Sequence, residues 1–465
     1  MKEGASAWTI RSLGMAYREG RTSPPEAVEQ IIGLIASLDP KLHAYITLDG
    51  EGALRTAREA EARFREGRPL GPLDGIPLAY KDLCFILGLP ATCGSLVYRD
   101  FEPRAECTAV HRLRAAGVVT LGKLNMAELA LGPTGHNMHF GDVQNPWKSG
   151  HIAGGSSSGS GAAVAAGLAL GALGSDTGGS IRLPSAFCGV VGLKPTWGRV
   201  SRVGAMPLSW SMDCLGPMTR TAEDNALIMQ TIAGYDPADA TTSRLPVPDY
   251  LSEMQKGAEG LRVGLPENFF FDAVSEETER AVREAIGVLE KLGADIVPVK
   301  LPAPEVLDAL TNLITKCEAA SIHGQVARER PGEITPQVLA RMETGFHIPA
   351  HEYLDALRLR ARLVKKYGEE VFSKVDALAA PAVPFSAPTL GETGVGAGEE
   401  MSEMIARLTR FTRMVSGLGA PAMSLPCGFS SGGLPLALQL IGAPFREDIL
   451  YRLAYAYECE TGGQS

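Results

Sequence analysis

The feature that most constrains this chain is a stretch of small residues from Gly154 to Arg182, which reads GGSSSGSGAAVAAGLALGALGSDTGGSIR. Two clusters rich in glycine and serine, 154–161 and 174–180, flank an apolar segment typical of a buried helix. A flexible Gly/Ser linker would not continue into such a segment. Glycine lets a backbone approach a ligand closely, and serine hydroxyls beside it are candidate nucleophiles. The pattern therefore favours a packed site for acyl transfer on an amide-like bond.

Helix and strand patterns alternate along the 465 residues, for example over 107–125 and 281–301. This alternation is typical of an α/β sheet. We expect one domain over 1–465, comprising an N-terminal helical region (1–70), a core (71–235) and a mainly helical, substrate-side region (302–410). The helices expected in the N-terminal region span 5–20, 24–37 and 49–67.

Charge and composition limit the expected partners. The formal net charge is −9, from 44 basic and 53 acidic residues, and the chain has no basic tract, so we expect no nucleic-acid partner. Because no apolar run is long enough to span a bilayer and the first residues lack a signal-peptide core, we expect a cytoplasmic protein without a membrane partner. Eight cysteines without a CxxC pair and eight dispersed histidines predict no metal site. No cofactor is expected, and a homo-oligomer is left open.

Two familiar motifs fit the small-residue stretch poorly. A phosphate-binding loop needs a lysine before its helix, where this chain has Ser160–Gly161–Ala162. A nucleophile elbow with Ser157 at its centre needs a strand that runs directly into the turn. The preceding segment, QNPWKSGHIA, is instead a loop punctuated by proline and glycine. The elbow is kept as a weaker alternative.

A third arrangement uses a lysine as the base. A serine hydroxyl becomes a good nucleophile when a neighbouring base takes its proton. A neutral lysine can do so when burial lowers its pKa. Lys81 lies in the apolar segment IPLAYKDLCFI, although a simple pair with Asp82 is the ordinary alternative for such a lysine.

Four segments together resemble the amidase signature family. They are GIPLAYKDL, GGSSSGSGAAVAAG, DTGGSIRLPSAFCGVVGLKPTWGRVSR and PAMSLPCGF followed by GLPLALQLIG. The resemblance extends over roughly residues 70–445. It implies a central, mixed, twisted β-sheet covered on both faces by helices, and a hydrolase that cleaves amide C–N bonds through an acyl-enzyme.

The resemblance also implies roles for particular residues. Ser180 matches the family nucleophile, Ser156 the serine in a cis peptide that relays the proton, and Lys81 the base. The backbone N–H groups of Thr177, Gly178, Gly179 and Ser180 match the oxyanion hole. Ala130, Leu131 and Gly132 match positions that line the substrate pocket. Asp176 and Arg182 are expected to form an ion pair that fixes the loop. Met206, Trp210 and Phe140 are candidate pocket walls, with core packing as the ordinary alternative for each.

The family contains both stand-alone amidases and the glutaminase (A) subunit of glutamyl/aspartyl-tRNA amidotransferase. In the latter, an acidic residue before the C-terminal motif binds the glutamine amino group, and the matching position here is Thr409, among Arg407, Arg410 and Arg413. This position, and the resemblance of the segment WGRVSRVGAMPLSWSMDCLGP to stand-alone amidases, favour a stand-alone amidase acting on a small-molecule amide, with aryl amides or carbamates as possible substrates. The glutaminase subunit is the alternative.

Overall fold

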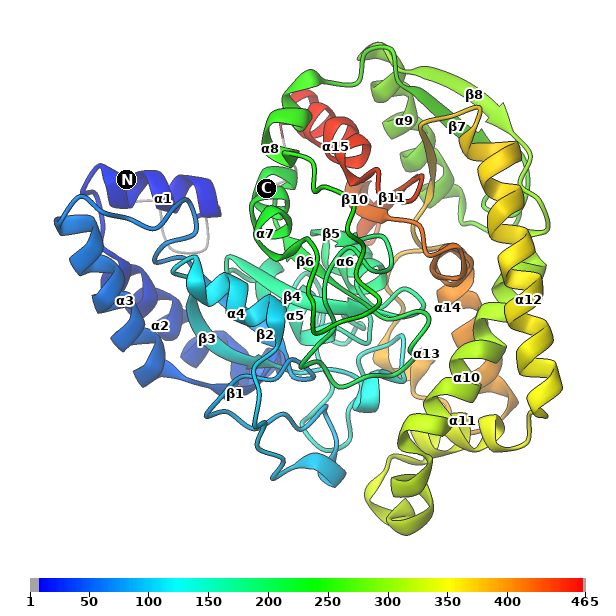
Figure 1. Ribbon diagram of the computed structural model, residues 1–465, viewed down its shortest axis with the longest axis horizontal. Coiled ribbons are helices and arrows are strands. Elements are labelled where there is room, and N and C mark those ends of the chain that lie inside the picture. The colour runs from blue at the N-terminus through cyan, green and yellow to red at the C-terminus, as the bar shows by residue number, and fades with distance from the viewer. Residues whose placement is uncertain (1–7, 463–465) are drawn as a thin grey trace.

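One mixed sheet of eleven strands forms the centre of the computed structural model, which describes residues 8–462 (Figure 1). The strand order is β1-β3-β2-β4-β6-β5-β10-β11-β9-β7-β8. The strands are β1 (Tyr45–Leu48), β2 (Pro77–Lys81), β3 (Val119–Leu124), β4 (Gly171–Asp176), β5 (Val191–Lys194), β6 (Cys214–Thr219), β7 (Arg262–Pro266), β8 (Asp295–Val299), β9 (Ala377–Pro381), β10 (Ala422–Phe429) and β11 (Pro435–Gly442). Strand β2 pairs in parallel with β3 and β4, and β7 with β8 and β9, whereas the other pairs are antiparallel.

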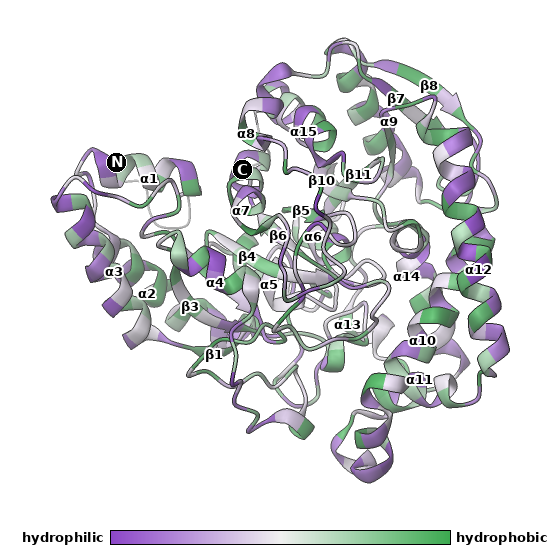
Figure 2. Ribbon diagram, in the orientation of Figure 1, coloured by the Kyte–Doolittle hydropathy of each residue, from purple (hydrophilic) through white to green (hydrophobic). Residues whose placement is uncertain are grey.

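Helices pack on both faces of this sheet, which confirms the predicted fold class (Figure 1). The helices are α1 (Ile10–Arg18), α2 (Pro24–Leu42), α3 (Gly50–Arg65), α4 (Thr108–Ala115), α5 (Ser158–Ala165), α6 (Arg182–Cys188), α7 (Ala222–Ile232), α8 (Tyr250–Glu253), α9 (Glu276–Lys291), α10 (Pro304–Glu329), α11 (Pro336–Phe346), α12 (Ala350–Tyr367), α13 (Leu390–Thr393), α14 (Glu399–Leu418) and α15 (Glu447–Thr461). Hydrophilic and hydrophobic residues alternate around the peripheral helices α2, α3 and α12 (Figure 2). None of the helices in the described residues is long and apolar enough to cross a membrane.

The N-terminal region is less uniformly helical than expected. Helix α2 begins at Pro24 as predicted, because Ser23 caps it and Glu26 returns a carboxylate to the Ser23 N–H at 2.9 Å. It then continues to Leu42, five residues beyond the expected end. The next four residues after a short break, YITL, form β1, which pairs with β3 at the edge of the sheet. The expected helix over 5–20 starts among residues that lie outside the described range, and α1 covers Ile10–Arg18.

The sheet brings the distant sequence motifs together. Because β2 and β4 are parallel, with Tyr80 opposite Leu173, the carboxyl ends of both strands lie at the same edge of the sheet. Lys81 ends β2, and the second small-residue cluster follows β4. The buried helix α5 begins within the first cluster, and a Cβ at Gly159 would lie 2.3 Å from the Ala44 carbonyl oxygen. Only glycine permits this approach, which places the start of α5 against Ala44, just before β1, and Asn125, just after β3.

Candidate active site

Lys81 is fully buried and lies between two serine hydroxyls. Its Nζ donates to Ser156 Oγ at 2.7 Å and to Ser175 Oγ at 2.9 Å. The adjacent Asp82 pairs instead with the buried Lys123 at 2.9 Å, so the ordinary pairing of Lys81 with its neighbour does not occur. Burial lowers the pKa of Lys81 to about 7, although nearby thiols and carboxylates act in the opposite direction and raise it. A substantial fraction of Lys81 is therefore neutral near neutral pH, as a general base requires.

Ser156 occupies the position that the resemblance implies. Its side chain is buried, and the Gly155–Ser156 peptide bond is cis. No motif assigned a role to Ser175, the second acceptor of Lys81. In the sequence, only its place in the second small-residue cluster pointed to a role for Ser175. The contact with Lys81 arises from the pairing of β2 with β4, strands that lie about 90 residues apart in the chain.

Ser157 links the two clusters and does not form an elbow nucleophile. Its Oγ donates to the Ser175 carbonyl at 3.1 Å and accepts from the Ser175 N–H at 3.2 Å. Its own N–H donates to the Ser180 carbonyl at 3.2 Å. Because its hydroxyl is engaged by the backbone on both sides, Ser157 holds Ser175 and Ser180 in place, and the elbow alternative fails.

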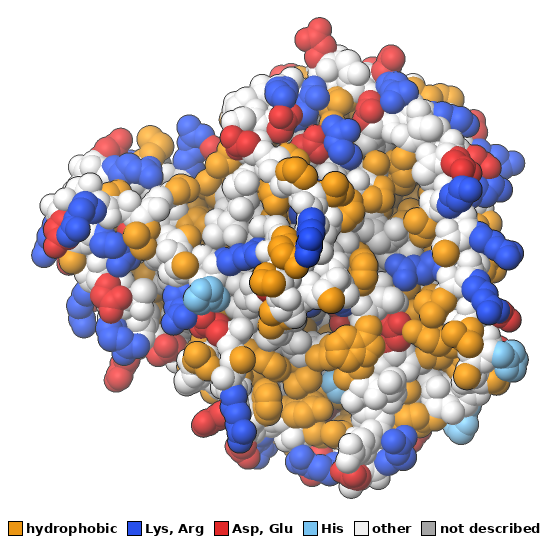
Figure 3. Space-filling model, in the orientation of Figure 1, with side chains coloured by type: hydrophobic (Ala, Val, Ile, Leu, Met, Phe, Trp, Pro, Cys, Tyr) orange, Lys and Arg blue, Asp and Glu red, His pale blue; other side chains and the backbone are white. Residues whose placement is uncertain are grey.

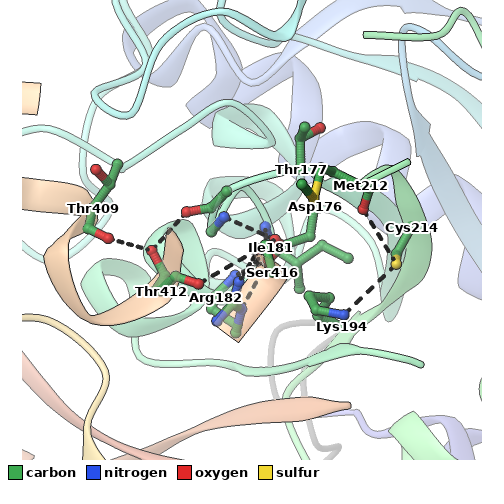
Figure 4. A network of polar contacts seen from close by, with 12 residues as sticks. Asp176, Thr177, Ile181, Arg182, Lys194, Met212, Cys214, Thr409, Thr412 and Ser416 are labelled. Carbon is green, nitrogen blue, oxygen red and sulfur yellow. Dashed lines mark hydrogen bonds and ion pairs between the residues drawn. The ribbon is translucent and has the colours of Figure 1, made fainter. Parts of the chain in front are cut away.

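A buried ion pair supports the loop that carries Ser180. Arg182 donates to both oxygens of Asp176, at 2.9 and 3.0 Å, and also to Gln439 and Ser416 (Figure 4). Burial opposes ionisation of Asp176, but the positive charge and hydrogen bonds of Arg182 outweigh it and hold the pKa of Asp176 below its ordinary value. The predicted ion pair is therefore present, and it closes the turn between β4 and α6.

Further hydrogen bonds hold the loop between β4 and α6 in place. Thr177 Oγ1 donates to Asp213 at 2.6 Å, and Thr412 Oγ1 donates to the Gly178 carbonyl at 2.8 Å. The Gly179 N–H donates to Asp176 at 2.8 Å, so this predicted oxyanion donor is already engaged. The N–H groups of Thr177, Gly178 and Ser180 have no hydrogen-bond partner among residues 8–462. They are the better placed candidates to meet a developing oxyanion.

Ser180 faces a small cavity of about 50 Å³. The lining includes the backbone at Gly155 and Gly178 and all three predicted pocket residues, Ala130, Leu131 and Gly132. A larger cavity of about 380 Å³ lies on the Ser175 side and includes Met206 and Trp210 among its walls. Phe140, the third candidate wall, lines neither cavity. Ala130, Thr177 and Leu208 line both cavities, so the loop after β4 lies between them.

The small cavity also contains charged residues for which the motifs gave no role. Arg341 from α11 and Arg413 from α14 contribute to its lining, together with Asn312, Thr315 and Thr409. The long helices that carry these residues fold back over the site from the far half of the chain. Within residues 8–462, no group of three or more His, Cys, Asp or Glu side chains has a metal-binding arrangement.

Comparison with known proteins places this site in a family. The family model described as Amidase matches residues 26–450. The chain is 42% identical to the A subunit of the glutamyl-tRNA(Gln) amidotransferase of Moorella thermoacetica, over 97% of this chain and 96% of that protein. It is 35% identical, with a TM-score of 0.92, to a chain reported from a vestigial protein complex that reveals the evolutionary origins of an s-triazine catabolic enzyme, covering 98% and 99% of the two chains. The corresponding amidotransferase chain from Thermotoga maritima is 32% identical with a TM-score of 0.81, covering 98% and 95%.

The comparisons correct two expectations. The preference for a stand-alone amidase is wrong, because it rested on Thr409 and one short segment, whereas similarity to the amidotransferase chains extends over nearly the whole sequence. The expectation of a protein that works alone, without a nucleic-acid partner, is also wrong, since these relatives are subunits of an enzyme named for its action on a tRNA. Basic and acidic side chains are interspersed over the face seen in Figure 3. That surface charge describes this chain alone and does not exclude an assembly in which another subunit carries the nucleic acid.

The family model covers most of the chain, and the fold brings the buried Lys81 next to Ser156 and Ser175. These observations lead to the same assignment. The chain belongs to the amidase signature family, whose members hydrolyse the C–N bonds of amides.

Proposed function

We propose that this chain is the amide-hydrolysing component of an amidotransferase, and that it releases ammonia from glutamine. The contact of 2.7 Å between Lys81 Nζ and Ser156 Oγ carries the catalytic part of the proposal. It joins a buried base to a serine beside the cavity that contains Ser180. The similarity to named amidotransferase chains over 97% of this sequence supports the assignment to such an assembly.

Proton transfer in the proposed reaction runs through Ser156. Neutral Lys81 takes the proton of Ser156 while Ser156 takes that of Ser180, whose Oγ attacks the amide carbon. The N–H groups of Gly178 and Ser180 stabilise the negative oxygen of the tetrahedral intermediate. The proton then returns through Ser156 to the leaving nitrogen, which departs as ammonia.

Water completes the cycle on the same residues. A water molecule gives one proton through Ser156 to Lys81 and attacks the acyl group on Ser180. As the bond to Ser180 Oγ breaks, that proton returns through Ser156 to Ser180 Oγ, the acid departs and Lys81 is neutral again. In an amidotransferase the ammonia is passed to an acceptor rather than lost to solvent. For the named relatives this acceptor is a glutamyl-tRNA, and we propose the same class of acceptor for the assembly that contains this chain.

Ammonia release from glutamine by the purified chain tests the proposal. Wild type is compared with Ser180→Ala and with Ser373→Ala, a control at an exposed serine remote from the cavity. We expect release that Ser180→Ala abolishes and Ser373→Ala leaves intact. Release that survives Ser180→Ala would contradict the proposed nucleophile.

A further inference from the structure

Residues 207–213 form a wall segment that leads into β6 and borders both cavities near Ser180. Leu208 lines both cavities, and Asp213 lines the larger one. One oxygen of the Asp213 carboxylate accepts from the Leu208 N–H at 2.8 Å and from the Ser209 N–H at 2.9 Å. The shape of the wall segment therefore depends on this carboxylate.

The same carboxylate connects the wall segment to the turn that carries Ser180. Its other oxygen accepts from Thr177 Oγ1 at 2.6 Å. Thr177 begins the run of predicted oxyanion donors that ends at Ser180. A displacement of the wall segment is therefore transmitted to these donors through the contact between Asp213 and Thr177.

Helix α10 holds the wall segment through Glu318, which is 4% exposed. One carboxylate oxygen accepts from the Ser211 N–H at 3.1 Å and from the Ser209 hydroxyl. The other accepts from the Ser211 hydroxyl at 2.9 Å and from the Tyr353 hydroxyl at 2.8 Å. All four donors are neutral, and a carboxylate has enough acceptor sites for all of them. Loss of the carboxylate leaves these donors without their acceptor, which releases the wall segment from α10.

The same helix holds the start of the wall segment through His323. Its Nε2 lies 3.0 Å from the Pro207 carbonyl oxygen, and the residue is buried. Burial lowers the pKa of His323 to about 4, so the ring is neutral at neutral pH and carries a single proton. Because a carbonyl only accepts, this proton lies on Nε2, and Nδ1 has no hydrogen-bond partner in the described part of the chain.

We infer that Glu318 is a positioning residue for amide hydrolysis at Ser180 and acts through the wall segment and the contact between Asp213 and Thr177. His323 supports the same position. The inference rests on the proposed hydrolysis at Ser180 and adds two residues that no sequence motif indicated. Glu318 is not among the described residues that line either cavity, so its loss is expected to lower kcat more than it changes KM.

Ammonia release from glutamine by Glu318→Gln measures this effect. Glutamine at position 318 keeps the size of the side chain but accepts through one oxygen only, so part of the hold on the wall segment is lost. We expect kcat to fall about tenfold while KM changes by less than about threefold. Glu447→Gln, at a buried carboxylate outside the described lining of both cavities, is the control and is expected to retain the wild-type kcat. An equal kcat in the two variants contradicts the inference.

Combination with Thr177→Val tests the route of the effect. This substitution removes the hydroxyl that contacts Asp213 and keeps the shape of the side chain. Glu318→Gln is expected to lower kcat about tenfold in the wild-type background but less than about twofold in Thr177→Val, because residues that act through one contact are not additive. The full loss in both backgrounds overturns the route.

Two substitutions of His323 separate its hydrogen bond from its bulk. His323→Gln can place an amide N–H near the position of Nε2 and keep the bond to the Pro207 carbonyl, whereas His323→Leu cannot. We expect His323→Leu to lower kcat about tenfold and His323→Gln to retain most of the wild-type value. Equal kcat values in the two variants overturn the part assigned to His323.

Inactivation by a small alkyl fluorophosphonate gives a readout that does not depend on glutamine. Ser180 Oγ attacks the phosphorus, its proton passes to Ser156 and fluoride leaves, so the rate reports the reactivity of Ser180 and its oxyanion donors. We expect the rate for Glu318→Gln to lie about tenfold below wild type and that for Glu447→Gln to be unchanged. This result without glutamine hydrolysis would support the inference and overturn the proposed ammonia donor. A wild-type rate in Glu318→Gln overturns the inference.

Discussion

At the scale of single residues, the protonation state of Lys81 determines when the proposed site is active. Burial lowers the pKa of Lys81 to about 7, and only the neutral amine takes a proton from Ser156. Below this pH the lysine is protonated and cannot act as a base. We expect kcat/KM to rise about tenfold per pH unit below pH 7 and to level off above it.

The pH profile of Lys81→Met provides the control for that prediction. Loss of the general base is expected to lower kcat/KM by about 10²–10⁴-fold and to remove the rise near pH 7. A rise of the same shape and midpoint in Lys81→Met would assign the titration to another group.

Ser175 is a positioning residue for Lys81. Its Oγ accepts from Lys81 Nζ at 2.9 Å, a contact that favours the charged lysine. Ser175→Ala is expected to reduce activity about tenfold and to move the rise in kcat/KM to lower pH. A purely structural role would lower activity without moving the midpoint.

At the scale of elements, the turn from β4 to α6 depends on the buried pair of Asp176 and Arg182. Both side chains are fully buried, so removal of the arginine leaves an uncompensated carboxylate. Arg182→Met is expected to reduce the free energy of unfolding by about 3–5 kcal/mol in urea denaturation. The exposed pair of Asp355 and Arg358 is the comparison, and Arg358→Met is expected to cost about 0–1 kcal/mol. Equal effects of the two substitutions would show that burial of the Asp176 pair carries no special weight.

Gly179 fixes the path of the same turn. Its φ is +131°, and an added Cβ would lie 2.1 Å from Thr412 Oγ1 on α14. Gly179→Ala is expected to lower kcat at least 100-fold by displacing Ser180, while the midpoint of unfolding changes much less than in Arg182→Met. Full activity in Gly179→Ala would mean that the contact with Thr412 does not position the nucleophile.

Local sequence signals predicted several elements because the determining residues are close together. The Ser23 cap and Pro24 predict the start of α2. The alanine-rich segment predicts a buried helix, which is right for α5 up to Ala165 and wrong for its second part, where Gly171–Asp176 forms β4. Strand β1 was missed because its four residues give too short a pattern and pair only with the distant β3. Short edge strands take their conformation from a partner and not from their own sequence.

At the scale of the whole molecule, the motifs located the reacting groups but not their surroundings. Lys81, Ser156 and Ser180 lie in segments that resemble a family. Ser175 and Arg341, in contrast, reach the site through the pairing of strands and through helices that fold back from the second half of the chain. The amidotransferase subunit was ranked second to a stand-alone amidase for a related reason, since local features such as Thr409 were weighed without a comparison of the full chain.

The central claim is that Ser180 carries the acyl group during amide hydrolysis. We would quench wild type in acid during turnover of glutamine, and locate any covalent adduct by mass spectrometry of the digested protein. We expect an added acyl mass on the peptide that contains Ser180, and none there in Ser180→Ala. An adduct on another residue, or turnover that persists in Ser180→Ala, would contradict the claim.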